Sequence, residues 1–325
     1  MDRALLDRLT APGPRLPWIA TWLSDTVWTM DAFRQADSPA RYMEKGESQV
    51  KDLEVILAAS SEAAYRELVE KPSADRTVKG FFDRNPRGSA VILDGCSIRE
   101  LPRLAELAVQ GKRRIVETGY ARAAIPSETE DFISDRLGYD LPRLGPSQLS
   151  NRREFSAQGV DFHYHRNRAD AVTLGSQAHA IIWSRFPDQI YLDSQASNSD
   201  MYDAIWDNLE LVWKKTVQAL PPDSPVLVTS DHGFIFLGGG LNDPGLERVD
   251  DALGGSRCRV FAENEQLPSA GRGLYIDKER RLGVLIGRCH NKPRAMSPYH
   301  SLYRHGGLSL MEMLTPWLVL GPMEG

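Results

Sequence analysis

The sequence is poor in cysteine. Its 325 residues include only Cys96, Cys258 and Cys289, an odd number with no CxxC pair. This count and spacing indicate neither a disulfide framework nor a structural zinc knuckle.

Two further absences narrow the class of protein. No apolar run is long enough to cross a membrane, and the start lacks the uninterrupted apolar core of a signal peptide. We therefore expect a cytoplasmic protein. The formal net charge is −5, whereas proteins that coat nucleic acid are strongly basic, so strong nonspecific nucleic-acid binding is not expected.

The chain does contain short apolar runs that end in polar residues. The runs are 90–93, 178–186 and 226–229, and the polar ends are Asp94, Asp188 and Asp231-His232-Gly233. Such runs predict buried strands of an α/β fold. Ligands of open α/β sheets bind beyond the carboxyl ends of the strands, so these side chains are candidates for one site. For each motif alone, a strand followed by a polar turn is the alternative.

The first part of the chain has no strand pattern. Residues 48–71 carry apolar side chains at helical spacing. We expect residues 1–88 to form a helical N-terminal extension, acting as a cap over a cleft, a docking element for partner proteins, or structural padding. Residues 89–325 would then form the catalytic α/β domain. Within it we expect further strands at 114–120, 257–261, 274–277, 281–287 and, briefly, 318–320.

A hydroxyl group stands near the start of a predicted short helix, at Thr129. A helix N-terminus favours a phosphate beside a nucleophilic hydroxyl. The alternative is that Ser127 or Thr129 only caps the helix. Cys96 and Ser97, which follow Asp94, are competing candidates for a nucleophile.

Residues 138–177 are basic in places and have no clear periodicity. Arg152, Arg153, Arg166 and Arg168 form either a rim that binds an anionic substrate, such as a nucleotide or oligonucleotide, or part of a solvated insertion.

Near the end of the chain, His305 precedes two glycines, whose missing side chains allow close approach of an ion or ligand. Ser309 and Glu312 have the spacing of a capping box. Together with Asp94, Asp188, Asp231 and His232, His305 completes a set of oxygen and nitrogen ligands that zinc accepts. Manganese or magnesium also suits such a set. Two ions could hold a phosphoryl group between them, with Thr129 alongside.

Five segments resemble the PglZ-type branch of the alkaline phosphatase superfamily, known from phage-defence systems such as BREX and from some response regulators. They are VILDG, IPSET, FPD, VTSDHG and YRHGGLSLMEM, and the resemblance covers roughly residues 89–325. It implies a three-layer α/β/α sandwich with a mixed central sheet, two zinc ions and a covalent phosphothreonine or phosphoserine route. By position, Asp94, Asp231 and His232 would hold one ion, Asp188 and His305 the other, and Thr129 would be the nucleophile.

One position departs from the family pattern. The family usually has a His or Asp four residues after the carboxylate that corresponds to Asp188, and this sequence has Leu192. Asp193 would serve as the ligand instead if the loop bulges. We therefore expect a metal-dependent phosphohydrolase acting on phosphomonoesters or phosphodiesters. The rival interpretation is a scaffold with a decayed site, docked in a defence complex through residues 1–88.

Overall fold

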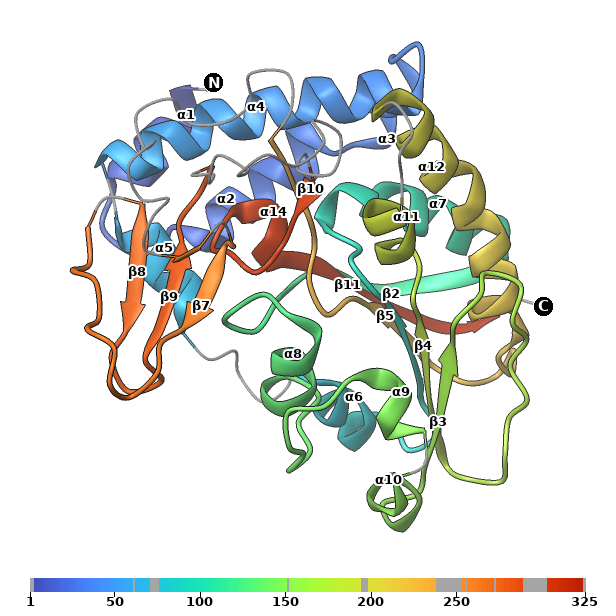
Figure 1. The fold of residues 1–325 in the computed structure, drawn as a ribbon. Helices are drawn as coiled ribbons and strands as arrows, with labels where there is room; N and C mark the ends of the chain where they lie inside the picture. The colour runs from blue at the N-terminus through green and yellow to red at the C-terminus, as the bar shows by residue number, and fades with distance from the viewer. Residues whose placement is uncertain are drawn as a thin grey trace.

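A six-stranded mixed sheet forms the centre of the computed structural model (Figure 1). The structure describes residues 3–60, 62–70, 76–150, 152–193, 198–237, 253–254, 256–271, 273–288 and 303–323. The strand order is β2-β11-β5-β1-β4-β3. Strands β5, β1, β4 and β3 run parallel, and β11 is antiparallel to both of its neighbours. The bounds are β1 Ser89–Leu93, β2 Arg113–Arg122, β3 Val160–His165, β4 His179–Ser184, β5 Val226–Thr229 and β11 Leu314–Met323. The expected α/β class with a mixed central sheet is confirmed.

Helices cover both faces of this sheet (Figure 1). One face packs on α7 (Leu101–Gln110), α11 (Asp188–Asp193) and α12 (Asn198–Lys215), and the other on α6 (Val78–Arg84), α8 (Thr129–Asp135), α9 (Pro146–Leu149) and α10 (Arg153–Ala157). Strand β1 shows why: Val91 and Leu93 belong to one hydrophobic cluster and Ala90 and Ile92 to the other. A central parallel strand must be apolar on both faces, which matches its uninterrupted apolar sequence.

A smaller three-stranded sheet, in the order β7-β9-β8, stands beside the main one. Its strands are β7 (Cys258–Val260), β8 (Leu274–Asp277) and β9 (Leu282–Leu285), and β8 and β9, which were predicted as strands, pair antiparallel as a hairpin. Two short strands, β6 (Ile235–Phe236) and β10 (Tyr303–Arg304), pair separately. The remaining helices are α1 Arg3–Thr10, α2 Leu16–Trp22, η1 Leu23–Val27, α3 Met30–Arg34, α4 Pro39–Ser60, α5 Glu62–Val69, η3 Ile98–Glu100, η4 Val217–Ala219 and α14 Leu310–Met313. None of the described helices has the length and hydropathy needed to cross a membrane.

Two expectations about strands need correction. The segment without periodicity contains β3, an edge strand whose two faces are both partly polar, so it shows little alternation. The short strand expected at 318–320 is the ten-residue β11, which lies between β2 and β5. Residues 238–245, whose glycines and Asn242-Asp-Pro-Gly245 predict a loop, lie outside the described residues.

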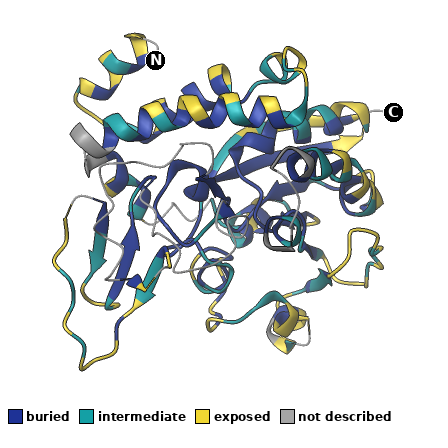
Figure 2. Ribbon diagram, turned by 45° about the horizontal axis from the view of Figure 1, so that its top comes forward, coloured by how far each residue is buried: buried dark blue, intermediate teal, exposed yellow. Residues whose placement is uncertain are grey.

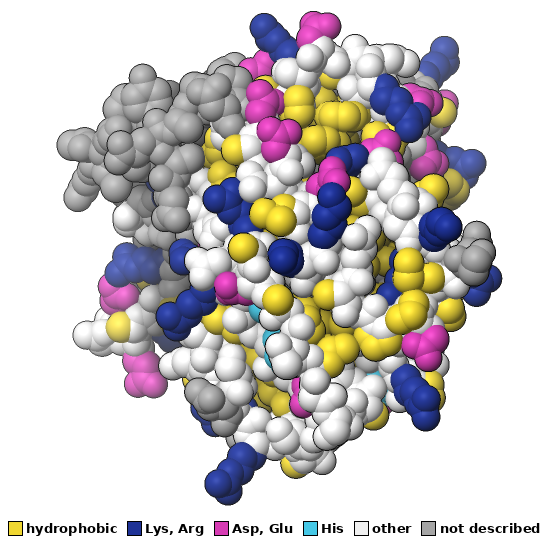
Figure 3. Space-filling view, turned by 90° about the vertical axis from the view of Figure 1, so that its right-hand side faces the viewer, with side chains coloured by type: hydrophobic (Ala, Val, Ile, Leu, Met, Phe, Trp, Pro, Cys, Tyr) yellow, Lys and Arg dark blue, Asp and Glu magenta, His cyan; other side chains and the backbone are white. Residues whose placement is uncertain are grey.

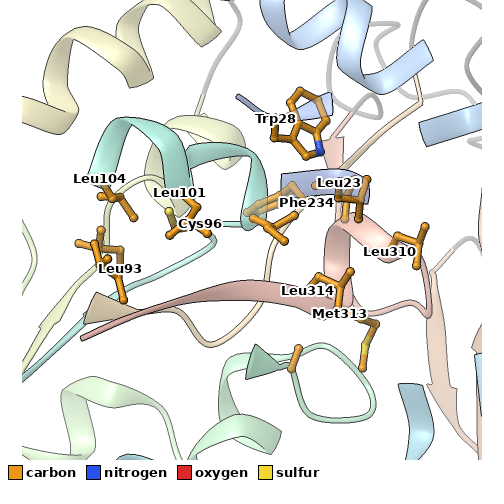
Figure 4. Close-up of a cluster of buried hydrophobic side chains, with 14 of the residues drawn as sticks. Leu23, Trp28, Leu93, Cys96, Leu101, Leu104, Phe234, Leu310, Met313 and Leu314 are labelled. Carbon is orange, nitrogen blue, oxygen red and sulfur yellow. The ribbon is translucent and has the colours of Figure 1, made fainter. Parts of the chain in front are cut away.

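The N-terminal helices pack into the same core as the sheet. Leu23 and Trp28 lie in one buried cluster with Phe234 and Leu310 (Figure 4). Helix α4 crosses the molecule with one face buried (Figure 2). The hydrophobic cluster is therefore continuous across the boundary that we expected near residue 88, and the docking role of residues 1–88 stays a proposal.

Helix α4 also carries two buried carboxylates that pair with arginines of the later chain. Glu47 is fully buried and forms ion pairs with Arg288 and, at 3.0 Å, with Arg99. Glu54 pairs with Arg288 at 2.8 Å. These arginines in turn donate to backbone carbonyls: Arg99 to that of Phe234, and Arg288, at 2.9 Å, to that of Phe236. Helix α4 is thus linked, through Arg99 and Arg288, to the backbone of the segment that directly follows His232.

Candidate metal centre

Three carboxylates converge at the carboxyl edge of the sheet, as the sequence predicted. Asp231 follows β5, Asp94 follows β1 and Asp188 follows β4, and these strands are adjacent in the order β5-β1-β4. Donor atoms of Asp94, Asp231 and His232 lie within 4.8 Å of one another, and so do those of Asp188, His232 and His305. The structure therefore brings together all five ligand candidates that follow a strand or precede the paired glycines.

His232 is held in the orientation and the protonation state that a metal ligand needs. Its Nδ1 lies 3.1 Å from the carbonyl oxygen of Gly233, so Nδ1–H donates there and Nε2 keeps its lone pair. Nε2 lies 3.7 Å from Asp94 Oδ1 and 3.6 Å from Asp231 Oδ2. Burial lowers the pKa of His232 to about 4, which leaves the imidazole neutral at pH 7.

His305 is oriented in the same way. Its Nδ1 lies 3.2 Å from the carbonyl oxygen of Ser127, and its ring stacks on that of His232 with centroids 4.2 Å apart. The Nε2 atom of His305 is then the ring nitrogen that can bind a metal. His305 belongs to the second group of candidate ligands, with Asp188 and His232.

Asp94 provides the test of whether a cation fits. Its Oδ2 accepts a hydrogen bond from Trp183 Nε1 at 3.1 Å, but its buried Oδ1 has no hydrogen-bond partner among the described residues. Burial, followed by the charges of Asp231 and Asp188, raises the pKa of Asp94 well above its ordinary value. Within the described part of the chain, no Lys or Arg pairs with Asp94 or Asp231. A buried, unpartnered carboxylate oxygen is costly, and a bound divalent cation would remove that cost.

Thr129 lies against this cluster. It is the first residue of α8, and its Oγ1 donates to Asp231 Oδ2 at 2.6 Å and lies 3.4 Å from His232 Nε2. Neither hydroxyl caps α8. Thr129 Oγ1 donates to Asp231, and Ser127 Oγ donates to the carbonyl oxygen of Gly307 at 3.0 Å.

The competing nucleophiles do not reach the centre. Ser97 Oγ donates to Glu100 at 2.9 Å and caps η3, while Cys96 lies 3.9 Å from the same carboxylate. Both side chains are buried. Thr129 is therefore the one of these three hydroxyl or thiol candidates that faces the carboxylates.

Asp188 begins α11, which continues without a bulge to Asp193. Position 192 is one turn after Asp188 and shares its face of the helix. Position 193 is rotated about 140° from Asp188 around the helix axis. The bulge that would have brought Asp193 toward Asp188 is therefore not formed, and the side chains at 192 and 193 lie outside the described residues.

The four arginines proposed to bind substrate are divided between two regions. Arg152 and Arg153 stand at the start of α10, beside the amino end of β3, so the structure does not bring them to the centre at the opposite edge. Arg166 directly follows the carboxyl end of β3, and Arg168 lines a hollow of about 650 Å³ with Gln189 and Asn208. On the face shown in Figure 3, basic and acidic side chains are interspersed rather than gathered in one basic rim.

Sequence reasoning missed Glu128. Its carboxylate lies 3.6 Å from His305 Nδ1, and it makes no side-chain capping bond to α8. Gly306 has a φ of +97°, and a Cβ there would lie 2.6 Å from Glu128 Oε1. A Cβ at Gly307 would lie 2.3 Å from Arg257, which pairs with Glu312. The glycines after His305 thus make room for the side chains of Glu128 and Arg257.

We predict that Glu128→Gln weakens metal binding about tenfold, because it removes a negative charge 3.6 Å from Nδ1 of the candidate ligand His305. Glu130→Gln, two residues away on α8, is the matched control and should leave affinity unchanged. Competition with a chromogenic chelator measures both. Equal affinity in the two variants would show that Glu128 does not act through His305.

Comparisons with known proteins give only a distant likeness. No family model matches the sequence, and no curated protein matches it. The solved structures that are similar include murine ectonucleotide pyrophosphatase/phosphodiesterase 5, with a TM-score of 0.45 and 12% identity over 73% of this chain and 88% of that one. An inactive variant of the murine protein in complex with AMP has a TM-score of 0.44 and 11% identity, and the human protein has 0.42 and 13%, with the same coverage. This likeness assigns no activity.

Proposed function

We propose that this protein is a metal-dependent hydrolase of phosphoric esters with Thr129 as the nucleophile. The observation that carries the proposal is the Thr129 hydroxyl 2.6 Å from Asp231 Oδ2, inside a cluster that holds the unpartnered Asp94 Oδ1. A hydroxyl beside a buried Asp/His ligand set is the arrangement that phosphoryl transfer to a side chain requires.

In this proposal Asp94, Asp231 and His232 hold one divalent ion, and Asp188 and His305 hold another. Zinc is the expected metal, and manganese or magnesium also suits mixed Asp/His donors. When bound, such ions lower the pKa of a nearby hydroxyl and neutralise the charge that develops on a phosphoryl group.

The residues of the chain supply the rest of the reaction. Thr129 gives up its proton toward Asp231 Oδ2, its present acceptor, and its oxygen attacks phosphorus. The bond from phosphorus to the ester oxygen breaks, and the leaving alcohol takes up the proton that Thr129 gave up. Water then attacks the threonyl phosphate, its oxygen stays on phosphorus, and one of its protons goes to the Thr129 oxygen as inorganic phosphate or a phosphomonoester departs.

The segments that resemble PglZ-type proteins support this proposal, because they carry all six residues of the centre. The same resemblance extends the proposal to a place in a phage-defence or signalling system, with a nucleotide or oligonucleotide as substrate. A second candidate function is a non-catalytic scaffold of such a system. Leu192 lies one helical turn after Asp188, where the family usually has a metal ligand. It favours the scaffold because leucine has no atom that can bind a metal.

Thr129→Ala tests the proposal. It should lower turnover of a chromogenic phosphodiester or phosphomonoester by about a thousandfold or more, because removing a covalent nucleophile costs at least that much. Thr129→Ser keeps a hydroxyl and should retain measurable turnover. Assays with added zinc or manganese, alongside trapping of a phosphorylated protein, distinguish the two variants. Full activity of the alanine variant would reject the covalent route. A wild-type protein that hydrolyses neither ester with any metal would favour the scaffold.

A further inference from the structure

His232 belongs to both groups of candidate ligands. The first group is Asp94, Asp231 and His232, and the second is Asp188, His232 and His305. Because Nδ1 of His232 faces the carbonyl oxygen of Gly233 at 3.1 Å, only Nε2 can bind a metal. That atom has one lone pair and binds one ion. The two groups therefore compete for a single donor.

The oxygen atoms around His232 Nε2 favour the first group. Donor atoms about 2.1 Å from a tetrahedral ion lie about 3.4 Å from one another. His232 Nε2 lies 3.7 Å from Asp94 Oδ1, 3.6 Å from Asp231 Oδ2 and 3.4 Å from Thr129 Oγ1. Asp94, Asp231 and Thr129 thus each place an oxygen atom near this spacing from His232 Nε2.

Without His232, the second group keeps only Asp188 and His305. A catalytic zinc site usually has three protein ligands. The nearest additional position on the same helix face is 192, one turn after Asp188 in α11, and a leucine there offers no donor atom. Among the described residues, the second position is therefore left with two protein ligands.

We propose that the two metal positions are unequal, and that a phosphate oxygen of the substrate completes the weaker one. The position at Asp94, Asp231 and His232 binds its ion tightly, whereas the position at Asp188 and His305 fills only when phosphate supplies a further donor. Binding of the second ion and of phosphate is then coupled, each raising the affinity of the other by the same factor. This inference rests on the metal centre of the proposed function.

Calorimetric titration of metal-free protein with zinc, with and without inorganic phosphate, tests the inference. We expect one tight ion and a second that binds at least about a hundredfold more weakly, because losing one ligand exceeds the ~10–100-fold cost of losing an outer partner. Phosphate should strengthen the second event about fivefold or more. His305→Ala should abolish the weak event and keep the tight one. Two ions of equal affinity in the unmodified protein would overturn the inference.

Leu192→His provides a gain-of-function test. A histidine one turn after Asp188 should bring the affinity of the second ion to within about tenfold of the first and remove its dependence on phosphate. Leu192→Phe, which has a ring without nitrogen, is the matched control and should bind zinc as the unmodified protein does. Identical titrations of the two variants would contradict the inference. Unequal binding without turnover of any ester would uphold it and reject the proposed enzyme, while binding of no ion would reject both.

Discussion

A chain that begins at residue 86 should fail to give soluble, folded protein. The deletion removes Glu47 and Glu54, and it leaves Arg99 and Arg288, which are 0% and 2% exposed, without their carboxylates. Stranding one charge of a buried pair costs about 3–5 kcal/mol, and a whole domain is stable by only about 5–15 kcal/mol. The loss of Leu23 and Trp28 from the core adds to this cost. Expression followed by size-exclusion chromatography and thermal unfolding measures the result.

A milder change separates the ion pairs from the rest of the deletion. Glu47→Gln in the full chain should lower the free energy of unfolding by about 3–5 kcal/mol. Glu44→Gln lies on the same helix with a side chain that is 45% exposed and pairs with Arg41, so it should cost less than about 1 kcal/mol. A soluble, cooperatively folding 86–325 fragment that still binds zinc would show instead that the N-terminal helices are a separable element.

The positions of the candidate ligands could be predicted because each of these residues stands where a local sequence pattern ends. Asp94 and Asp231 follow runs of apolar residues long enough to be buried strands, and parallel neighbours carry their ends to the same edge of the sheet. Thr129 could be placed because Pro126 and the apolar face of α8 mark a helix start. Each of these patterns spans about ten residues, so it can be recognised in the sequence without knowledge of the fold.

The features that were missed depend on contacts between distant parts of the chain. Glu128 lies 3.6 Å from His305 Nδ1 across a separation of 177 residues (305 − 128), and nothing in the local sequence distinguishes it from a solvated glutamate. The arginines at 152 and 153 were assigned to the site because β3 was not recognised, so the end of the strand that they precede was unknown. A domain boundary near residue 88 was expected because the predicted helices give way to predicted strands there. The buried ion pair between Glu47 and Arg99 crosses this boundary and could not be inferred from either segment alone.

Replacing Asp231 with asparagine should remove metal binding and turnover together while preserving the fold. The Oδ1 atom accepts hydrogen bonds from the backbone N–H groups of His232, at 2.9 Å, and Gly95, at 3.1 Å. An asparagine side-chain oxygen can accept both, so the loop after β5 keeps its conformation. At Oδ2 the substitution places an amide group, which carries no charge and cannot accept the Thr129 proton. Zinc affinity should therefore fall at least about a hundredfold, more than the loss of an outer partner causes.

Metal content, ester hydrolysis and thermal unfolding, measured on the same preparation, test this prediction. Metal content and hydrolysis of both chromogenic esters should fall together, whereas the thermal unfolding midpoint of the metal-free proteins should change little. Asp140→Asn, at an exposed position outside both groups of candidate ligands, removes the same charge and should change none of the three. Retained zinc with lost turnover would assign Asp231 to the proton of Thr129 alone. Retained turnover would place the reaction elsewhere on the protein, since an Asp231 that neither binds metal nor accepts a proton has no part in the proposed chemistry.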